Sequence, residues 1–383
     1  MNRIYCDHAA TSPMSPEVFD AMRPFLSDSQ GNASSMYEEG RAAKCAIDES
    51  RETLSEALAC EFGEVTFTGS GTEAVNLALI GLTLRHLHGD RKKVLMGSQE
   101  HHAAIECAEL LNELGFKVEF IRTLPNGLVD MDDFSIKLDE SVLAVCLMHA
   151  NNETGAIQPV QHAFEQAHQA GAVTICDCVQ TFGNLTVKPK EMGADLVAIS
   201  AHKIGGPKGA GALFVEAGIK LQPLLIGGGQ ERELRAGTES VANIVGFAAA
   251  TRKLGSLTER AQKKMSARDA FEAVLQAELA DGMTWTLPET TDRLGGHSHF
   301  RVPGIQAESL LIRLDRLGVS ASSGAACSSG SVMPSHVLLA MGLSDSEAKE
   351  GVRFTFGPEM TAEIATEAAH RTISAVKEIR QVR

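Results

Sequence analysis

Short apolar segments and helix-like segments alternate along the first two thirds of the chain. The apolar segments lie at residues 65–68, 94–96, 117–121, 143–149, 173–178, 196–200 and 211–215. Within residues 102–114, apolar side chains recur every three positions, which is typical of an amphipathic helix. Such alternation predicts a mostly parallel sheet with helices on both faces. The run at 143–148 is apolar throughout and fits a strand buried on both sides.

The last third of the chain has a different pattern. Residues 241–280 are rich in helix formers and are expected to bridge two domains. Beyond them the pattern predicts a strand near 299–302, an amphipathic helix closed by Gly318, a capping box of Ser344 with Glu347, a strand at 352–356 and a helix after Thr361. These elements predict a small α+β domain.

The length of 383 residues also favours two domains, because a single core stops growing near roughly 250 to 300 residues. The predicted large domain spans 15–255, and the small domain combines 1–14 with 256–383. Residues 320–331 are all small. Such a run cannot pack a core, so we expect a mobile loop at about 320–334 in the small domain.

Composition narrows the class of protein further. The net charge of −14, with no basic tract, argues against nucleic acid as a partner. The N-terminus has no apolar signal region, and nowhere do about 18 apolar residues run together, so we expect a cytoplasmic protein without a membrane anchor. The eight cysteines lack the paired spacing of disulfide frameworks or zinc sites. We therefore expect free thiols and no metal.

Lys203 stands directly after a predicted buried strand and before a glycine-rich turn, 205–209. A desolvated ammonium has a lowered pKa, and the neutral amine can attack a carbonyl to form a Schiff base. An isolated lysine more often caps a strand and extends to water. Its surroundings favour the catalytic interpretation.

A phosphate site is predicted where residues 68–73 join a strand to a helix that begins near Glu73. Backbone N–H groups and the helix dipole converge there. The same segment matches a loose dinucleotide fingerprint, with Asp90 as its acidic residue, so a nicotinamide-binding oxidoreductase is an alternative. A second alternative is that the glycines of this segment serve only to form a tight turn.

Two further candidates follow from predicted strand ends. Asp177 ends a buried strand, where its carboxylate needs a cation; a protonated pyridine nitrogen would supply one and become an electron sink. A structural ion pair is the alternative. His101 opens a helix at the carboxyl end of the sheet, where it can stack on a ring or relay protons, although many histidines simply begin helices.

Cys327 is the cysteine that lies in the predicted mobile loop, where an exposed thiolate is free to act as a nucleophile. Arg353 belongs to a predicted strand of the small domain. Its guanidinium has the geometry to bind a substrate carboxylate through two hydrogen bonds, and a surface salt bridge is the alternative.

With these residues in view, the chain resembles the cysteine desulfurases, pyridoxal-phosphate enzymes of the class V aminotransferase group. The resemblance runs from Tyr5 to about Gly357. It is carried by Gly-Thr-Glu at 71–73 with Asn76, Glu-His at 100–101, Asn-Asn-Glu-Thr-Gly at 151–155, Asp177 with Gln180, Ser-Ala-His-Lys at 200–203, Gly-Gly-Gly-Gln-Glu at 227–231, Arg-Ala-Gly-Thr at 235–238 and Ser-Gly-Ala-Ala-Cys-Ser-Ser-Gly at 323–330. The segment 7–12 departs from the family's usual asparagine and paired threonines, a change that bears on substrate preference.

The resemblance implies a type I fold of the pyridoxal-phosphate transferases, with a seven-stranded sheet, and a homodimer. It also implies a role for each candidate: Lys203 holds pyridoxal 5′-phosphate covalently, His101 stacks on its ring and Asp177 pairs with its nitrogen. It assigns Gln180 and Asn152 to the ring hydroxyl and the substrate side, Gly71, Thr72, Ser200 and His202 to cofactor and phosphate binding, and Thr238 to the phosphate of the neighbouring subunit.

The implied reaction converts L-cysteine to L-alanine. Arg353 holds the substrate carboxylate, Lys203 takes the α-proton, and Cys327 receives the sulfur as a persulfide for a sulfur-acceptor protein, either an iron-sulfur scaffold or another carrier. A selenocysteine lyase or a class V aminotransferase is the nearest alternative. A catalytically silent interaction protein with the same fold is a more distant one.

Overall fold

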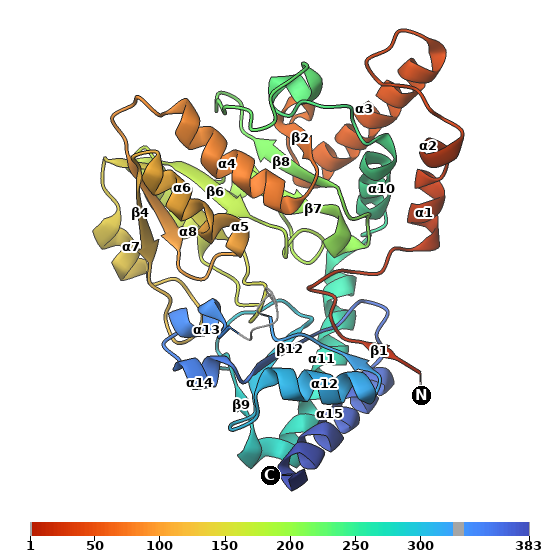
Figure 1. The fold of residues 1–383 in the computed structure, drawn as a ribbon, viewed down its shortest axis with the longest axis vertical. Helices are drawn as coiled ribbons and strands as arrows, with labels where there is room; N and C mark the ends of the chain where they lie inside the picture. Colours follow the sequence, from red (N-terminus) through yellow and green to blue (C-terminus); the bar gives the residue numbers. More distant parts are fainter. Residues whose placement is uncertain (1, 325–332, 383) are drawn as a thin grey trace.

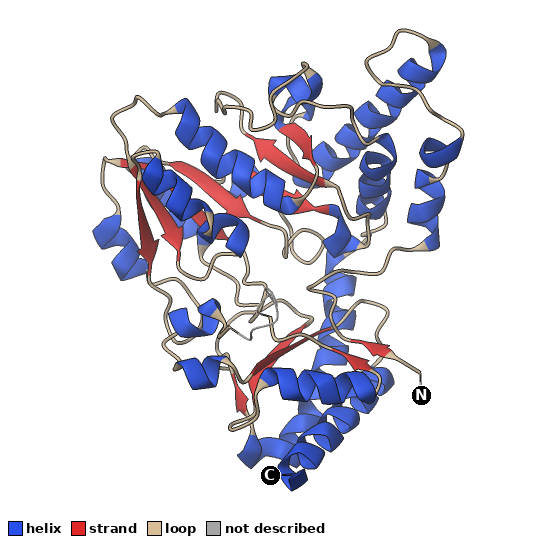
Figure 2. Cartoon of the chain, viewed as in Figure 1, coloured by secondary structure: helices blue, strands red, loops and turns tan. Residues whose placement is uncertain are grey.

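The fold is that of a computed structural model which describes residues 2–324 and 333–382. A sheet with helices on both faces forms the larger part, and a smaller part holds both ends of the described chain (Figure 1). Figure 2 shows the strands of the large sheet between two layers of helices. The predicted α/β fold with a mostly parallel seven-stranded sheet is confirmed.

The large sheet contains the seven strands expected from the apolar segments. They are β2 (Val65–Thr68), β3 (Lys93–Gly97), β4 (Lys117–Ile121), β5 (Val142–Met148), β6 (Val173–Asp177), β7 (Leu196–Ser200) and β8 (Gly211–Val215). Their order is β2-β8-β7-β6-β5-β3-β4, and β8 is antiparallel to both of its neighbours. The other pairs are parallel, so most strands end at the same edge.

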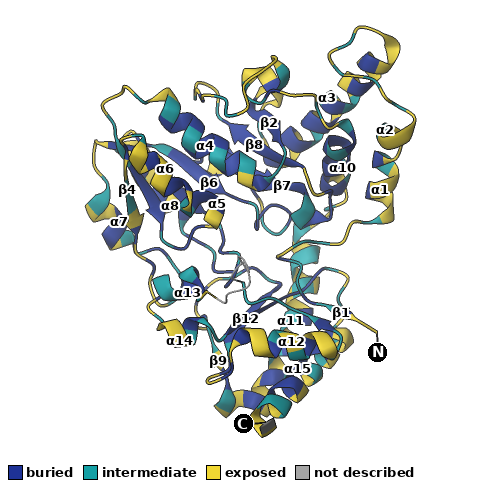
Figure 3. Cartoon of the chain, in the orientation of Figure 1, coloured by how far each residue is buried: buried dark blue, intermediate teal, exposed yellow. Residues whose placement is uncertain are grey.

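Helices bury both faces of this sheet, which explains why its central strands are apolar throughout (Figure 3). One face packs against α4 (Gly71–Arg85), α5 (His102–Ile105) and α6 (Cys107–Glu113). The other packs against α1 (Pro16–Met22), α3 (Glu38–Leu58), α7 (Met131–Lys137), α8 (Val160–Gln169) and α10 (Val241–Arg252). Two short helices, α2 (Pro24–Ser27) and α9 (Pro189–Met192), complete this part.

The smaller part is built on an antiparallel sheet of β9 (Thr284–Trp285), β10 (His297–Arg301) and β12 (Gly351–Thr355). Beside it, β1 (Ile4–Tyr5) pairs with β11 (Val319–Ser320). The helices are α11 (Leu257–Leu279), α12 (Ala307–Arg316), α13 (His336–Ala340), α14 (Asp345–Ala348) and α15 (Ala362–Val382). Phe271 and Phe354, whose ring centroids are 4.6 Å apart, lie in its core.

One expected helix is interrupted, and the predicted bridge contains two helices. The predicted helix at 102–114 is divided into α5 and α6 at Glu106, which caps the end of the first and the start of the second. The predicted bridge at 241–280 is divided into α10 and α11. Gly255 has a φ of +59° and Ser256 caps α11 with its side chain, so the chain turns between the two helices. The capping box of Ser344 and Glu347 is present.

Within residues 2–324 and 333–382, no helix has both the length and the apolar character needed to span a bilayer.

Candidate active site

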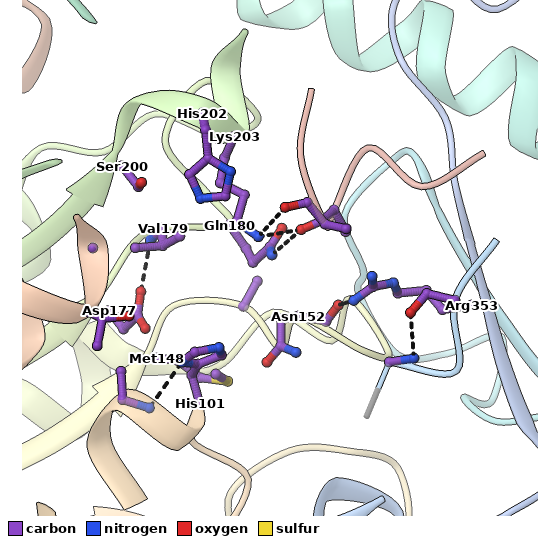
Figure 4. A pocket seen from close by; sticks show the side chains of 18 of the residues that line it. His101, Met148, Asn152, Asp177, Val179, Gln180, Ser200, His202, Lys203 and Arg353 are labelled. Atoms are coloured by element: carbon purple, nitrogen blue, oxygen red, sulfur yellow. Dashed lines mark hydrogen bonds between the residues drawn. The ribbon is translucent and has the colours of Figure 1, made fainter. Parts of the chain in front are cut away.

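The carboxyl ends of the parallel strands open onto a cavity of about 540 Å³ (Figure 4). Asp177 is the last residue of β6, His101 follows β3, and Lys203 lies in the turn after β7. Gly71 begins α4 after β2. Because parallel strands end at one edge, residues far apart in sequence meet there, as in other open α/β sheets that bind ligands.

The predicted site residues converge on this cavity, with two exceptions. Those that line it are Gly71, Thr72, His101, Asn152, Asp177, Gln180, Ser200, His202, Lys203 and Arg353. Thr238 is exposed and does not line the cavity, so its expected role toward the neighbouring subunit stays a prediction. Cys327 lies outside the described residues. Ser322, Ser323 and Gly324, which precede it, do line the cavity.

Lys203 is held at its amine by the N-terminal segment of the chain. Its Nζ donates hydrogen bonds to the carbonyl oxygens of Ala10, at 3.0 Å, and Ala9. Burial lowers the pKa of Lys203 to about 8, the positive charge of Arg353 adds to this shift, and Asp177 opposes it. The amine therefore reaches its neutral, nucleophilic form near physiological pH, as the sequence predicts.

Asp177 and His101 lie on one side of the cavity. The Oδ1 atom of Asp177 accepts a hydrogen bond from the Val179 amide at 2.8 Å. Burial raises the pKa of Asp177, whereas the charges of His101 and Lys203 oppose that shift. Burial also lowers the pKa of His101. Its Nδ1 accepts a hydrogen bond from the Ala103 amide at 3.0 Å, so the proton of the neutral ring is assigned to Nε2.

The start of α4 forms a second wall. Ser70 caps this helix by accepting a hydrogen bond from the Glu73 amide at 3.0 Å. A Cβ atom added to Gly71 would lie 2.6 Å from a methyl carbon of Val179, so only glycine fits there without displacement. Burial lowers the pKa of His202 to about 4, so its imidazole is neutral at pH 7.

Gln180, Asn152 and Arg353 extend the cavity toward the smaller part. Figure 4 shows Arg353 across the cavity from Asp177, with Gln180 and Asn152 between them in this view. Gln180 Nε2 donates to the Ala9 carbonyl at 2.9 Å, and Arg353 Nη1 donates to the Asn152 carbonyl at 2.7 Å. Arg353 is buried, so the alternative of a surface salt bridge is wrong.

The N-terminal segment makes hydrogen bonds to the other residues of the site that its sequence, linked above only to substrate preference, does not predict. Asp7 accepts a hydrogen bond from Arg353 Nη2 at 2.8 Å, and Thr11 Oγ1 lies 3.3 Å from His202 Nδ1. The Ala9 and Ala10 carbonyls line the cavity and accept the hydrogen bonds of Lys203 and Gln180. A charged residue directly after the apolar run at 4–6 was the available signal, but no local pattern predicts which strand that carboxylate meets.

Comparison with known proteins identifies the family. Residues 4–365 match the model of the family described as Aminotransferase class-V. The chain is 38% identical to "Cysteine desulfurase IscS" of Dictyoglomus turgidum, over 94% of this chain and 91% of that protein. It is also 38% identical to "Putative cysteine desulfurase IscS 1" of Bacillus subtilis, over 99% and 100% of the two chains.

Solved structures agree with this result. One titled "NIFS-LIKE PROTEIN" superposes with a TM-score of 0.91 at 28% identity and covers 98% of this chain and 100% of its own. Another, titled "SspA in complex with cysteine", has a TM-score of 0.82 at 29% identity, over 92% and 99% of the two chains. The chain therefore belongs to the class-V aminotransferase family. Within that family it groups with the cysteine desulfurases, which overturns the alternative of a nicotinamide-binding oxidoreductase.

Enzymes of this family depend on pyridoxal 5′-phosphate, and the cavity fits that group. Ser200 Oγ and Asn152 Oδ1 are buried and have no hydrogen-bond partner among the described residues, so both are available to a polar ligand. Gly71 packs directly against Val179 and Ser200, so the absence of a side chain lets the start of α4 approach Ser200 closely. An aldehyde, a ring nitrogen and a phosphate thus each find a suitable group: the Lys203 amine, the Asp177 carboxylate, and the α4 N-terminus with Ser200.

Proposed function

We propose that this chain is a cysteine desulfurase that converts L-cysteine to L-alanine and transfers the sulfur atom to Cys327. The observation that carries the proposal is that one cavity is lined both by Lys203, whose pKa is lowered, and by the buried guanidinium of Arg353. The first supplies a base and the second a site for a carboxylate, which are the two groups that an α-amino acid substrate requires. Membership of the desulfurase group gives the substrate class.

When bound, pyridoxal 5′-phosphate supplies a ring that accepts the electrons released at the α-carbon. Asp177 would pair with the ring nitrogen of the bound group and favour its protonated form, and His101, whose pKa is lowered by burial, would present a neutral imidazole to the ring. Lys203 takes the α-proton of the substrate, because its neutral form is accessible near pH 8. Arg353 holds the substrate carboxylate and so orients the Cα–H bond toward that amine.

Cys327 is the proposed sulfur acceptor, and it lies outside the described residues. Its thiolate attacks the sulfur of bound cysteine: the carbon–sulfur bond breaks and a sulfur–sulfur bond forms. L-Cysteine and one enzyme thiol thus become L-alanine and one enzyme persulfide, with no net proton or electron. The persulfide is then passed to an acceptor protein, which we propose to be an iron-sulfur scaffold or another sulfur carrier.

We propose that the active form is a homodimer in the cytoplasm. Apolar side chains that a monomer would expose to water support the dimer: Ile226 is 82% exposed, in the segment that leads to Thr238, and Met36 is 85% exposed. In such a dimer Thr238 reaches the cofactor phosphate of the partner. Light scattering of the purified protein tests this, since a monomer at micromolar concentration would contradict it.

The reaction itself is tested with L-cysteine and a reductant in excess. The holoenzyme should release sulfide and alanine in equal amounts. Replacing Cys327 by serine should abolish sulfide release while the visible absorption of the cofactor still responds to L-cysteine. Unchanged sulfide release by Cys327→Ser would contradict the mechanism, and consumption of L-cysteine by the unaltered enzyme without formation of alanine would favour an aminotransferase of the same class.

A further inference from the structure

Glu153 is a buried carboxylic acid that the proposed mechanism does not use. It lies in the turn that follows β5 and is 1% exposed. The Asn151 side chain fixes this turn, since its Oδ1 accepts hydrogen bonds from the amides of Glu153 and Thr154, both at 2.9 Å. Asn151 Nδ2 in turn donates to the Gln99 carbonyl at 3.1 Å. The backbone of Glu153 is therefore held in place next to the large sheet, and this fixes the position from which its side chain extends.

The Glu153 side chain contacts Gly324, which directly precedes the undescribed segment 325–332, and Ser335, which lies three positions after it. Ser335 Oγ donates a hydrogen bond to Glu153 Oε2 at 2.5 Å. On the other side, Gly324 packs so closely that an added Cβ would lie 2.8 Å from Glu153 Cγ. Gly324 also has a φ of +81°, a conformation that favours glycine. One carboxyl side chain thus joins the two ends between which Cys327 lies in the sequence.

On the C-terminal side of the undescribed segment, the residues around Ser335 are hydrogen-bonded to the segment that contains His101. Ser335 Oγ caps α13 by accepting a hydrogen bond from the Leu338 amide at 3.2 Å, and Ser335 is 2% exposed. The next residue, His336, donates from Nε2 to the Glu100 carbonyl at 2.9 Å. Its ring centroid lies 4.5 Å from that of His102. In Figure 1, α13 lies where the smaller part meets the large sheet.

On the N-terminal side of the undescribed segment, Gly324 is connected to Arg353 through Ser322. The Gly324 amide donates to Ser322 Oγ at 3.1 Å. Ser322 forms a β-bridge with Arg353, in which the two amides donate at 3.1 Å and 2.6 Å. Arg353 also binds the Asn152 carbonyl, next to Glu153. Glu153 therefore contacts both Gly324 and Ser335, and each of these two residues is connected to residues that line the cavity.

We propose that Glu153 is a positioning residue that fixes the separation and direction of Gly324 and Ser335, and thereby supports sulfur transfer to Cys327 without touching the substrate. The inference rests on the proposed function, because it assigns the sulfur to Cys327. It predicts that the loss of Glu153 impairs the transfer of sulfur more than the removal of the α-proton, which depends on Lys203.

The charge around Glu153 fits this role. Burial raises the pKa of Glu153 to about 7, while the hydrogen bond from Ser335, Arg353 of β12 and His102 of α5 favour the ionised form. A carboxylate accepts the Ser335 hydrogen bond more strongly than a neutral group does. Glutamine at position 153 keeps the shape and one acceptor oxygen but lacks the charge, so it separates the two contributions.

The test compares two reactions of the holoenzyme. The first is the exchange of the α-hydrogen of L-alanine with deuterium oxide, which needs Lys203 but no thiol. The second is the rate at which a persulfide forms on Cys327 in a single turnover with L-cysteine. Glu153→Ala should slow persulfide formation about tenfold or more, since small misplacements of reacting groups have effects of that size, and leave exchange within about twofold. Ser335→Ala should act in the same direction, and Glu153→Gln less strongly.

The exposed Glu165 of α8 provides a matched control, because Glu165→Gln removes a carboxylate far from these contacts and should change neither rate. The alkylation rate of Cys327 in the resting protein, followed by peptide mass spectrometry, should change in Glu153→Ala. Pairwise coupling is expected too: the double variant with Ser335→Ala should lose less than the sum of the single variants.

Equal losses in exchange and persulfide formation would overturn the inference, as would an unchanged rate of persulfide formation. If Glu153→Ala does not fold, Ser335→Ala, which removes one oxygen atom, carries the same test. Sulfide release that survives Cys327→Ser would instead overturn the proposed function, so the two failures are distinguishable.

Discussion

Arg353 Nη2 and Asp7 Oδ1 are joined by a partly buried ion pair of 2.8 Å across 346 positions of the sequence. The Arg353 side chain is 5% exposed, and its Nη1 is held by the Asn152 carbonyl. Its Nε is buried and has no partner among the described residues. Asp7 therefore orients the guanidinium before any substrate arrives, and an N–H group remains for a carboxylate.

Arg353→Ala should raise the KM for L-cysteine by about tenfold to a hundredfold, with a smaller fall in kcat, because a hydrogen bond to a charged group contributes roughly 1.5 to 3 kcal/mol. The KM of Arg353→Lys should lie between those of the unaltered enzyme and Arg353→Ala, since lysine keeps the positive charge but lacks the planar guanidinium. Steady-state rates at varied L-cysteine measure both effects. Arg316→Ala, at an exposed position on α12, is the control. An unchanged KM for Arg353→Ala would exclude the assigned role.

Much of this site is predictable because its residues follow local rules. Lys203, Asp177 and His101 each stand at or just after an apolar strand, and the carboxyl ends of parallel strands share one edge. Asp7 and the Ala9 carbonyl are different, because they reach the cavity through pairing of the N-terminal segment with residues more than 170 positions away. Periodicity carries no information on such long-range contacts.

The sequence does not specify how residues 241–280 divide into helices. Helix formers dominate both sides of Gly255, and a single glycine within a helical pattern is often tolerated. The deciding features are its φ of +59° and the capping hydrogen bond of Ser256 to the Glu259 amide. Both depend on how the two helices pack against different cores.

The lowered pKa of Lys203 makes a prediction about the attachment of the cofactor. Only the neutral amine attacks an aldehyde, so the rate of attachment to apoprotein should rise with pH and level off above about pH 8. The appearance of the visible absorption band after mixing with pyridoxal 5′-phosphate measures this rate. Arg353→Ala should move the midpoint to higher pH, because it removes a neighbouring positive charge. A rate that keeps rising to the ordinary lysine pKa would contradict the desolvated environment.

A buried ion pair supports the segment that leads to Thr238. Both terminal nitrogens of Arg51 donate to the Glu231 carboxylate at 2.7 Å, and Glu231 also accepts from the Phe67 amide at 2.8 Å. Residues 231–233 have φ values of 45°, 55° and 68°, an unfavourable conformation for three residues other than glycine. The ion pair therefore holds a strained turn in place.

Glu231→Ala should lower the free energy of unfolding by about 3 to 5 kcal/mol, because it leaves the Arg51 charge buried and unpaired. Chemical denaturation followed by circular dichroism measures the change. Glu233→Gln, at the exposed end of the same turn, should have little effect. Equal stability of the Glu231→Ala protein and the wild type would mean that the pair contributes nothing to the fold.

The central claim is that sulfur leaves L-cysteine for one particular thiol. A single turnover of the holoenzyme with L-cysteine and no reductant, followed by peptide mass spectrometry, tests it most directly. The account predicts one added sulfur atom on the peptide that contains Cys327, in an amount equal to the alanine formed. Alanine formed with the added sulfur on another cysteine, or with no protein-bound sulfur, would contradict it.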